Sequence, residues 1–253
     1  MKKTKYLVII IIFVVLAGFL YLNRSYAYIY NHIAKMHLTS PYQQQTYSLK
    51  SQQPNVKTIK YVALGDSLTA GVGSLDYQKT FPYLLAQNLA QKNNVDLINL
   101  AVPGAKTQDL IDSQINQAIK LQPDYITLLI GINDIHGLIS AKKFETNFSE
   151  IINQLAEKTK AKIIVINLPY LGGKNLIFPP YDYYFKQKTE QFNKIIKTQA
   201  ENKSVCQIDL FSQTNDLFSK NIQLYSTDFF HPSAKGYQLW ANIIYANSNC
   251  FSN

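Results

Sequence analysis

The first strong feature of the hydropathy pattern is an uncharged apolar run from Tyr6 to Leu22. Lys2, Lys3 and Lys5 precede this run. Its 17 residues reach the lower limit for a helix that spans a bilayer, since a helix rises about 1.5 Å per residue. Basic residues on the short side of a span stay in the cytoplasm, so the chain that follows should lie outside. The pattern predicts an N-terminal transmembrane helix.

A cleaved secretory signal is the alternative for the same segment. Ser25-Tyr26-Ala27 loosely resembles the small-x-small site of signal peptides, and cleavage after Ala27 would give a secreted protein. The apolar core of a signal peptide is usually about 7–15 residues long, which favours the retained anchor here. No cysteine follows the run closely, which excludes a lipoprotein anchor. Residues 1–27 are therefore assigned to a membrane anchor or signal segment.

Residues 28–58 are rich in Tyr, Gln, Ser and Thr and lack sustained periodicity. We interpret them as a stalk or linker with one short helix near Ile29 to Met36. Residues 59–253 then form a single domain, because about 200 residues suit one domain with a sizeable core.

Within residues 59–253, short apolar runs typical of strands alternate with helical patterns. The strands are expected at 61–64, 95–100, 125–130, 162–167 and 205–210, and the helices at 81–92, 107–121, 144–155, 185–200 and 233–246. Continuous apolar strands separated by helices predict a parallel sheet covered on both faces. Sites in such sheets lie just beyond the carboxyl ends of the strands.

The formal net charge of +9 raises the question of nucleic acid. Arg24 is the only arginine, however, and it lies beside the apolar run. Phosphate and base recognition favours the arginine fork over the point charge of lysine, and no zinc-finger or RNA-recognition motif is present. We therefore expect no nucleic-acid partner. A lysine-rich surface facing anionic lipid or wall polymer explains the charge equally well.

Three strand ends carry candidate chemistry. Gly65-Asp66-Ser67 follows the first strand and can present Ser67 at the head of a helix, where N–H groups favour negative charge. Gly104 follows the second strand and could bring its N–H close to a substrate. Asn133 follows the third strand and offers an amide donor. Each signal alone also fits an ordinary helix cap or turn.

The candidate base lies beyond the last strand, in Asp228-Phe229-Phe230-His231-Pro232. Asp228 could fold back to hold the imidazole of His231, or the pair could be a cap and a surface histidine. Of the other histidines, His32 and His37 fall in the expected stalk, and His136 is a poorer second candidate for the base.

These blocks, in this order, resemble the four signature blocks of the SGNH hydrolase (GDSL-type esterase/lipase) family. The resembling segments are Gly65-Asp66-Ser67, Gly104, Gly131-Ile132-Asn133-Asp134 and Asp228-Phe229-Phe230-His231-Pro232, within residues 61 to about 240. The resemblance implies a three-layer α/β/α fold with a five-stranded parallel sheet of the flavodoxin-like kind. It implies hydrolysis of carboxylic esters without a cofactor.

The resemblance also implies the role of each residue. Ser67 would be the nucleophile, His231 its base and later the acid, and Asp228 the residue that orients His231. The N–H groups of Ser67 and Gly104 and the amide of Asn133 would form an oxyanion hole. Asp66 and Asp134 should bond backbone around the loops. No metal is expected, since the cysteine count and histidine spacing offer no zinc site.

The sequence is consistent with two classes of ester substrate. One is an acyl ester near the membrane, including lysophospholipids; the other is O-acetylated cell-wall or extracellular polysaccharide. Tyr170, Phe178 and Tyr181 are candidate substrate-binding residues, because aromatic side chains in the loop expected from Tyr170 to Phe185 could line an acyl pocket or stack on a sugar. They could also merely pack the loop onto the domain. A non-catalytic glycan-binding module is the alternative of another class.

The two cysteines are Cys206, on the expected fifth strand, and Cys250, near the C-terminal end of the sequence. An extracytoplasmic location permits a disulfide between them, and two free thiols are the alternative.

Overall fold

The structure, a computed structural model, describes residues 2–39, 45–170, 173, 175–203 and 205–251. Its centre is a sheet of six strands in the order β1-β3-β2-β4-β5-β6. The strands are β1 (Gln45–Leu49), β2 (Thr58–Gly65), β3 (Asn94–Asn99), β4 (Tyr125–Leu129), β5 (Lys162–Ile166) and β6 (Cys206–Ile208). β2 to β6 form a parallel sheet, and β1 pairs antiparallel with β3 at one edge.

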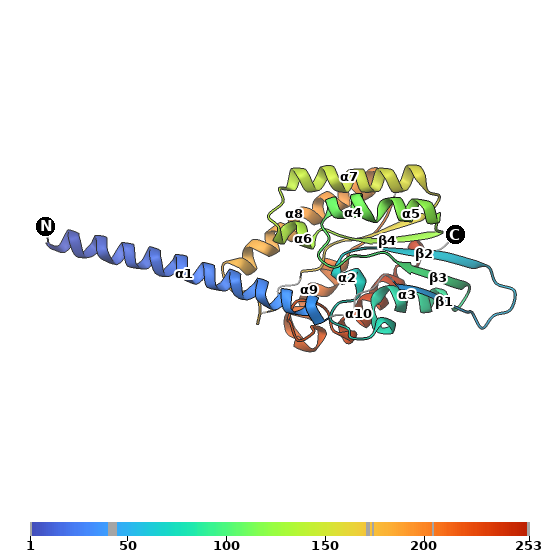
Figure 1. The fold of residues 1–253 in the computed structure, drawn as a ribbon, viewed down its shortest axis with the longest axis horizontal. Helices are drawn as coiled ribbons and strands as arrows, with labels where there is room; N and C mark the ends of the chain where they lie inside the picture. The colour runs from blue at the N-terminus through green and yellow to red at the C-terminus, as the bar shows by residue number, and fades with distance from the viewer. Residues whose placement is uncertain (1, 40–44, 171–172, 174, 204, 252–253) are drawn as a thin grey trace.

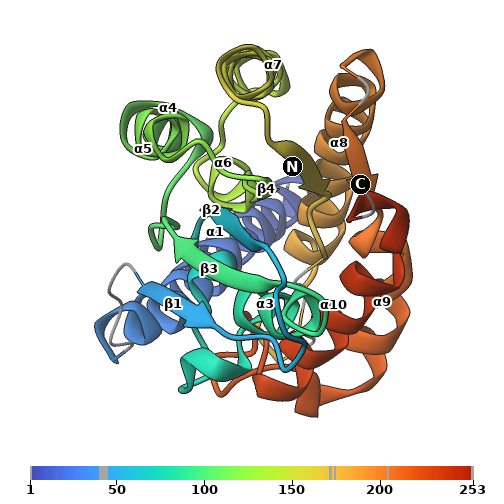
Figure 2. The same ribbon diagram turned by 90° about the vertical axis from the view of Figure 1, so that its right-hand side faces the viewer.

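Helices cover both faces of the sheet (Figures 1 and 2). On one face lie α3 (Phe81–Leu89), α9 (Leu210–Lys220) and α10 (Ala234–Ala246); on the other lie α4 (Thr107–Ser113), α5 (Ile115–Leu121), α7 (Ala141–Lys158) and α8 (Tyr181–Asn202). All five residues of β4 are buried, as expected for a central strand covered on both sides. The expected three-layer α/β/α architecture is confirmed.

The edge strand β1 corrects the expected number of strands from five to six. It lies within residues 28–58, which were expected to be a stalk. Its side chains alternate between exposed Thr46 and Ser48 and half-buried Tyr47 and Leu49, so only one side meets the core. Such a short, polar edge strand carries little hydrophobic signal, which explains why the pattern did not reveal it.

Two helical expectations are also corrected. The helix expected over 107–121 is divided into α4 and α5 at Gln114. α9 was not expected at all. Its buried positions are Leu210, Thr214 and Phe218. One of them is a threonine, and the apolar Phe211 and Leu217 fall outside this stripe, so the helical periodicity is weak in sequence.

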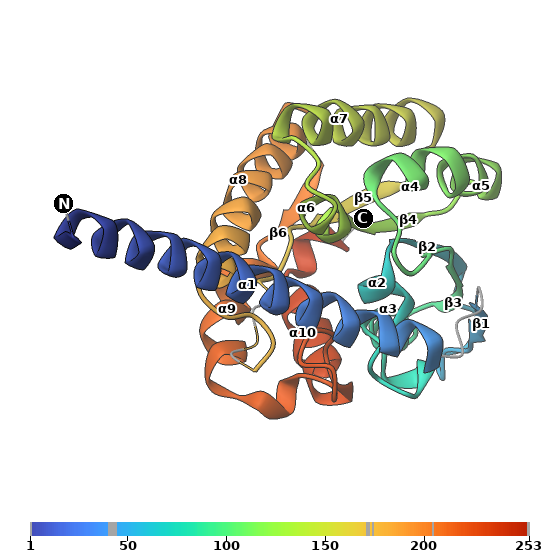
Figure 3. The ribbon, with the colours of Figure 1, turned by 60° about the vertical axis from the view of Figure 1, so that its left-hand side comes forward.

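The N-terminal helix α1 (Lys2–Thr39) is much longer than the apolar run and absorbs the short helix expected near Ile29. Its first half projects from the domain (Figure 1). The large apolar side chains from Tyr6 to Tyr21 are 50% to 70% exposed. Its second half passes over the body of the protein (Figure 3), where Ile29 is fully buried.

Candidate active site

Ser67 is the first residue of α2 (Ser67–Ala70), directly beyond the carboxyl end of β2. The turn requires glycine at position 65, where φ is +155° and a Cβ would lie 2.3 Å from Leu129 O. The Asp66 carboxylate caps the helix by accepting a hydrogen bond from the Leu68 N–H at 3.0 Å. Within the described part of the chain, the Ser67 N–H donates to no acceptor.

Ser67, His231 and Asp228 form one hydrogen-bonded series. His231 Nε2 lies 2.9 Å from Ser67 Oγ, and His231 Nδ1 lies 2.5 Å from Asp228 Oδ2. None of the three residues is more than 3% exposed. An Nδ1–H that donates to Asp228 leaves Nε2 as the nitrogen that can accept the Ser67 proton. The structure thus brings together the three residues that the sequence proposed as a triad.

Asp228 is held by more than His231. Its Oδ1 accepts hydrogen bonds from Ser226 Oγ at 2.5 Å, from the Phe230 N–H at 2.9 Å and from the His231 N–H at 3.0 Å. Burial acts to raise the pKa of Asp228, but the hydrogen bonds from His231, Ser226 and Phe230, with the attraction of His231, hold it below its usual value. Asp228 is therefore an oriented carboxylate.

The candidate oxyanion donors come from the loops that follow β3 and β4. Gly104 is exposed with φ +82°, and its N–H has no acceptor among the described residues. Asn133 lies on α6 (Ile132–His136), and its Nδ2 donates to Ala105 O at 3.1 Å and, at 3.4 Å, to Asp66 Oδ2. These bonds place the Asn133 amide beside the residue that precedes Ser67.

Asp66 and Asp134 form a buried acidic support under these loops. Asp134 accepts from the Thr107 N–H at 2.9 Å and from Thr107 Oγ1 at 2.6 Å, which ties α6 to α4. Burial, with a smaller effect of the nearby Asp134 charge, raises the pKa of Asp66 to about 7. Burial also raises the pKa of Asp134. Their bonds to backbone groups match the structural role expected for them.

His136, the second candidate for the base, lies apart from the hydrogen-bonded series. It is buried against Phe185 and Phe230, with ring centroids 4.5 and 5.4 Å away. Its Nδ1 has no hydrogen-bond partner in the described structure, and burial lowers its pKa to about 4. His136 is therefore held as a neutral ring, and the histidine that is hydrogen-bonded to Ser67 is His231.

The three aromatic candidates for substrate binding connect parts of the protein. Tyr170 OH donates to Asp182 O at 3.1 Å, and Tyr181 OH donates to Leu22 O in α1 at 3.2 Å. Phe178 packs near Tyr28 of α1, with the ring centroids 5.9 Å apart. Residues 171, 172 and 174 of this loop lie outside the described residues. Phe178 and Tyr181, the first residue of α8, thus join this region to α1, whereas Tyr170 bonds to α8.

Three supporting residues escaped the sequence reasoning. The buried Gln114 side chain accepts from the Gly65 N–H at 3.0 Å and donates to Gly65 O at 2.8 Å, which clamps the turn before Ser67. Asn99 donates to Thr69 O at 2.8 Å. Gly73 has φ +95°, and a Cβ there would lie 2.9 Å from His231 Cβ. A glutamine within a helical pattern looks like a surface residue, and the sequence over 107–121 shows no break at Gln114, so no local signal pointed to its role.

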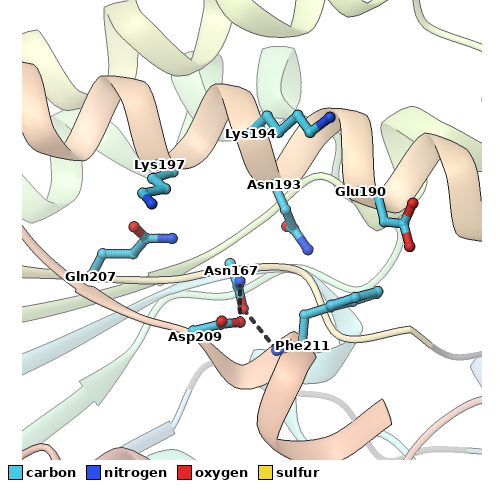
Figure 4. A pocket seen from close by; sticks show the side chains of 8 residues that line it. All are labelled: Asn167, Glu190, Asn193, Lys194, Lys197, Gln207, Asp209 and Phe211. Atoms are coloured by element: carbon cyan, nitrogen blue, oxygen red, sulfur yellow. Dashed lines mark hydrogen bonds between the residues drawn. The ribbon is translucent and has the colours of Figure 1, made fainter.

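A separate cleft of about 390 Å³ lies between α8 and the ends of β5 and β6 (Figure 4). Asn167 donates to Asp209 Oδ1 at 2.7 Å and accepts from the Phe211 N–H at 2.9 Å. Asn193 bonds both backbone groups of Leu168. These amides are occupied in holding loops, and none of the lining residues belongs to the Ser67 series. Among the described residues, no cluster of three His, Cys, Asp or Glu side chains could hold a metal.

Cys206 and Cys250 are joined by a disulfide, with their Cα atoms 5.6 Å apart. The bridge links β6 to the short turn of helix at Ser248–Cys250. Asp228 and His231 lie in the loop of chain that it closes.

An α/β/α protein with this Ser-His-Asp series at the carboxyl edge of a parallel sheet belongs to the SGNH class of folds. Residues 63–239 match the model of the GDSL-like Lipase/Acylhydrolase family, and the chain belongs to this family.

Among curated proteins, the chain is 26% identical to the uncharacterized protein YpmR of Bacillus subtilis (strain 168) over 231 residues, covering 78% of this chain and 85% of YpmR. Among solved structures it is similar to the acetylxylan esterase Axe2 of Geobacillus stearothermophilus, with TM-score 0.62, 19% identity and coverage of 77% and 95%. It is also similar to a lipase/acylhydrolase of Enterococcus faecalis, with TM-score 0.61, 23% identity and coverage of 75% and 94%. At such identities the two structures show the shared fold.

Proposed function

We propose that this protein is a membrane-anchored serine esterase that hydrolyses carboxylic (acyl) esters outside the membrane. The observation that carries the proposal is the buried series from Ser67 Oγ through His231 to Asp228. A serine hydroxyl is a poor nucleophile until a neighbouring base accepts its proton, and His231 Nε2 lies at hydrogen-bonding distance for that transfer.

The proposed reaction begins when Ser67 Oγ attacks the ester carbonyl carbon as His231 Nε2 takes its proton. The carbonyl oxygen becomes an oxyanion, which the N–H groups of Ser67 and Gly104 and the Asn133 amide stabilise. One such donor lowers a barrier by about 2.7–4 kcal/mol in serine hydrolases. Asn133 exchanges its bond to Ala105 O or Asp66 for the oxyanion.

The intermediate then breaks its bond to the alcohol, which leaves with the proton held by His231. The acyl group stays on Ser67 as an ester. Water attacks that ester as His231 accepts a second proton, and cleavage of the acyl–Oγ bond releases the acid as Ser67 recovers its proton. Throughout, Asp228 stabilises the imidazolium and holds the ring in place.

The proposed anchor is α1, of which Lys3–Asn31 is long and apolar enough to cross a membrane. The exposed apolar side chains of its first half support this, because a surface of that size in water would aggregate. The disulfide supports an extracytoplasmic domain, since such bonds persist in oxidising compartments. The uncharacterized lipoprotein YqeF of Bacillus subtilis (strain 168) is 25% identical to this chain, and the match covers 56% of YqeF.

An O-acetyl esterase acting on polysaccharide is the second candidate. Ser67 is only 2% exposed, which favours a small acyl group over a long chain in the conformation described. Membrane attachment and the aromatic residues joined to α1 favour an acyl ester presented at the bilayer. Neither proposed activity depends on the oligomeric state of the protein.

The decisive experiment compares the full-length wild type with Ser67→Ala on an activated ester such as a p-nitrophenyl ester. The variant should lose turnover while keeping its circular dichroism spectrum. Covalent labelling by a fluorophosphonate should likewise disappear in the variant. Retained turnover and labelling would remove Ser67 as the nucleophile, and a folded, inactive wild type would favour a binding module.

A further inference from the structure

The second half of α1 is docked on the domain by hydrogen bonds. Tyr21 OH donates to Pro179 O at 2.9 Å, and Tyr28 OH donates to Asn175 O at 3.3 Å. Tyr30 OH donates to the carbonyl of His136, the last residue of α6. Together with the burial of Ile29, these bonds fix the rotation and depth of α1 relative to the catalytic domain.

An open groove of about 700 Å³ lies between α1 and the loop at Phe178. From α1 it is lined by Tyr21, Arg24, Tyr28 and Asn31, whose spacings of three, four and three residues place them on one helix face. Ser25 lines it as well. Among the described residues that line it, none is acidic.

Arg24 is exposed, and its guanidinium makes no ion pair or hydrogen bond within the described part of the chain. The Ser25 hydroxyl and the Asn31 amide are equally without partners there. The groove thus gathers one cation and two neutral donors that no described protein group satisfies. Five guanidinium N–H donors in a planar fork match the oxygens of a phosphate.

The position of the groove along α1 points to a membrane lipid as the source of a phosphate ligand. Arg24 lies two residues beyond the end of the apolar run at Leu22, about 3 Å along a helix axis. With α1 spanning the bilayer as proposed above, Arg24 lies at the headgroup level of the leaflet from which α1 emerges. Tyr21, Tyr28 and Phe178 beside it are aromatic, the residue type enriched where membrane meets water.

We propose that this groove binds the phosphate of a membrane phospholipid, with Arg24 as its main ligand and Ser25 and Asn31 as further donors. The bound lipid holds the docked helix and the catalytic domain at one depth and tilt on the bilayer. The proposal rests on the membrane span proposed above but not on ester hydrolysis, because no residue of the Ser67 series lines the groove.

The test uses full-length protein in detergent, titrated with dioleoyl phosphatidylglycerol and measured by native mass spectrometry. The wild type should retain one phospholipid, and Arg24→Gln should weaken retention about tenfold or more through the loss of a charge-assisted pair. Arg24→Lys should fall between them, because it keeps the charge without the fork. Lys92→Gln removes the same charge next to the amino end of β3 and should bind as the wild type does.

Equal retention by Arg24→Gln and the wild type would overturn the proposal. Displacement of the lipid by inorganic phosphate alone would overturn it too, by showing a free-phosphate site. A thermal unfolding curve for each variant checks that it is folded, and a misfolded Arg24→Gln leaves Arg24→Lys and Asn31→Ala as the variants that decide. Ser67→Ala should retain lipid as the wild type does, which keeps this result separate from that of the esterase.

Discussion

His231 and Ser67 are 164 positions apart in sequence, yet His231 Nε2 lies 2.9 Å from Ser67 Oγ. That approach depends on the chain around His231. Gly73 leaves room for its side chain, and the Tyr237 hydroxyl donates to Val72 O at 2.8 Å, tying α10 to the segment after α2. The loop that carries Ser67 and the loop that carries His231 are thus packed as one unit.

The first prediction concerns Asp228. Asp228→Asn should lower kcat by about three to four orders of magnitude with KM little changed, because a neutral amide neither fixes the tautomer of His231 nor stabilises its imidazolium. Steady-state kinetics on an activated ester measures this. Asp216→Asn, at an exposed position on α9, is the matched control. Near-normal kcat in Asp228→Asn would exclude the proposed role.

The second prediction concerns Gln114. Gln114→Leu removes the side-chain partner of the buried Gly65 N–H, while the Gly65 carbonyl loses one donor and keeps the Val102 N–H at 3.1 Å. A buried polar group left without a partner costs about 1–3 kcal/mol. Urea unfolding should show a lower free energy of unfolding, and turnover should fall because the turn before Ser67 loosens. Gln117→Leu, on the exposed side of α5, should change little by comparison. Equal stability of the two variants would contradict the clamp.

The third prediction concerns pH and Asp66. Its pKa rises on folding to about 7, so the folded state binds the proton more tightly than the unfolded state. The stabilisation from protonated Asp66 is therefore complete below the unfolded pKa of about 4 and is lost as pH rises towards 7. Asp66→Asn should flatten this part of the profile.

Melting temperature against pH, for wild type and Asp66→Asn, measures that difference. The subtraction removes the contributions of other titrating groups, such as His136. Parallel curves between about pH 4 and 7 would show that Asp66 titrates normally.

Sequence reasoning was strongest where one physical signal dominated. The part of β2 from Tyr61 to Leu64 is a continuous apolar run, and β4 is apolar except for Thr127. The position of Ser67 follows from the rule that sites lie beyond such strands. It was weakest where contacts between residues far apart in sequence determine the structure. Nothing local distinguishes β1 from a linker, because its stability comes from pairing with β3. Gln114 becomes a clamp only when folding brings it to Gly65.

The fourth prediction concerns processing. Cleavage after Ala27 would cut a helix that is docked on both sides of that point, since Ser25 and Ile29 are both buried. We expect the mature protein to fractionate with membranes and to retain residues 1–27 in its intact mass. Protease added outside intact cells should remove the catalytic domain. Soluble protein beginning at Tyr28 in the medium would establish cleavage instead.

The fifth prediction separates the two substrates. A different observation supports each class of substrate. The docking of α1 beside Tyr181 favours an acyl chain delivered from the bilayer. The near-complete burial of Ser67 favours a small acyl group such as acetyl. A series of p-nitrophenyl esters from acetyl to decanoyl, assayed with the full-length protein in detergent, measures the acyl site through kcat/KM.

If the site takes lipid chains, kcat/KM should rise with length, because each buried CH₂ contributes up to about 0.8 kcal/mol until the pocket is full. That is roughly a fourfold gain per carbon at most. Hydrolysis of a lysophospholipid should accompany the rise. A sharp optimum at acetyl, with release of acetate from an acetylated glycan and none of fatty acid from the lysophospholipid, would assign the site to O-acetyl ester cleavage. In that case the acyl site admits little more than an acetyl group, and α1 serves only to hold the enzyme at the membrane.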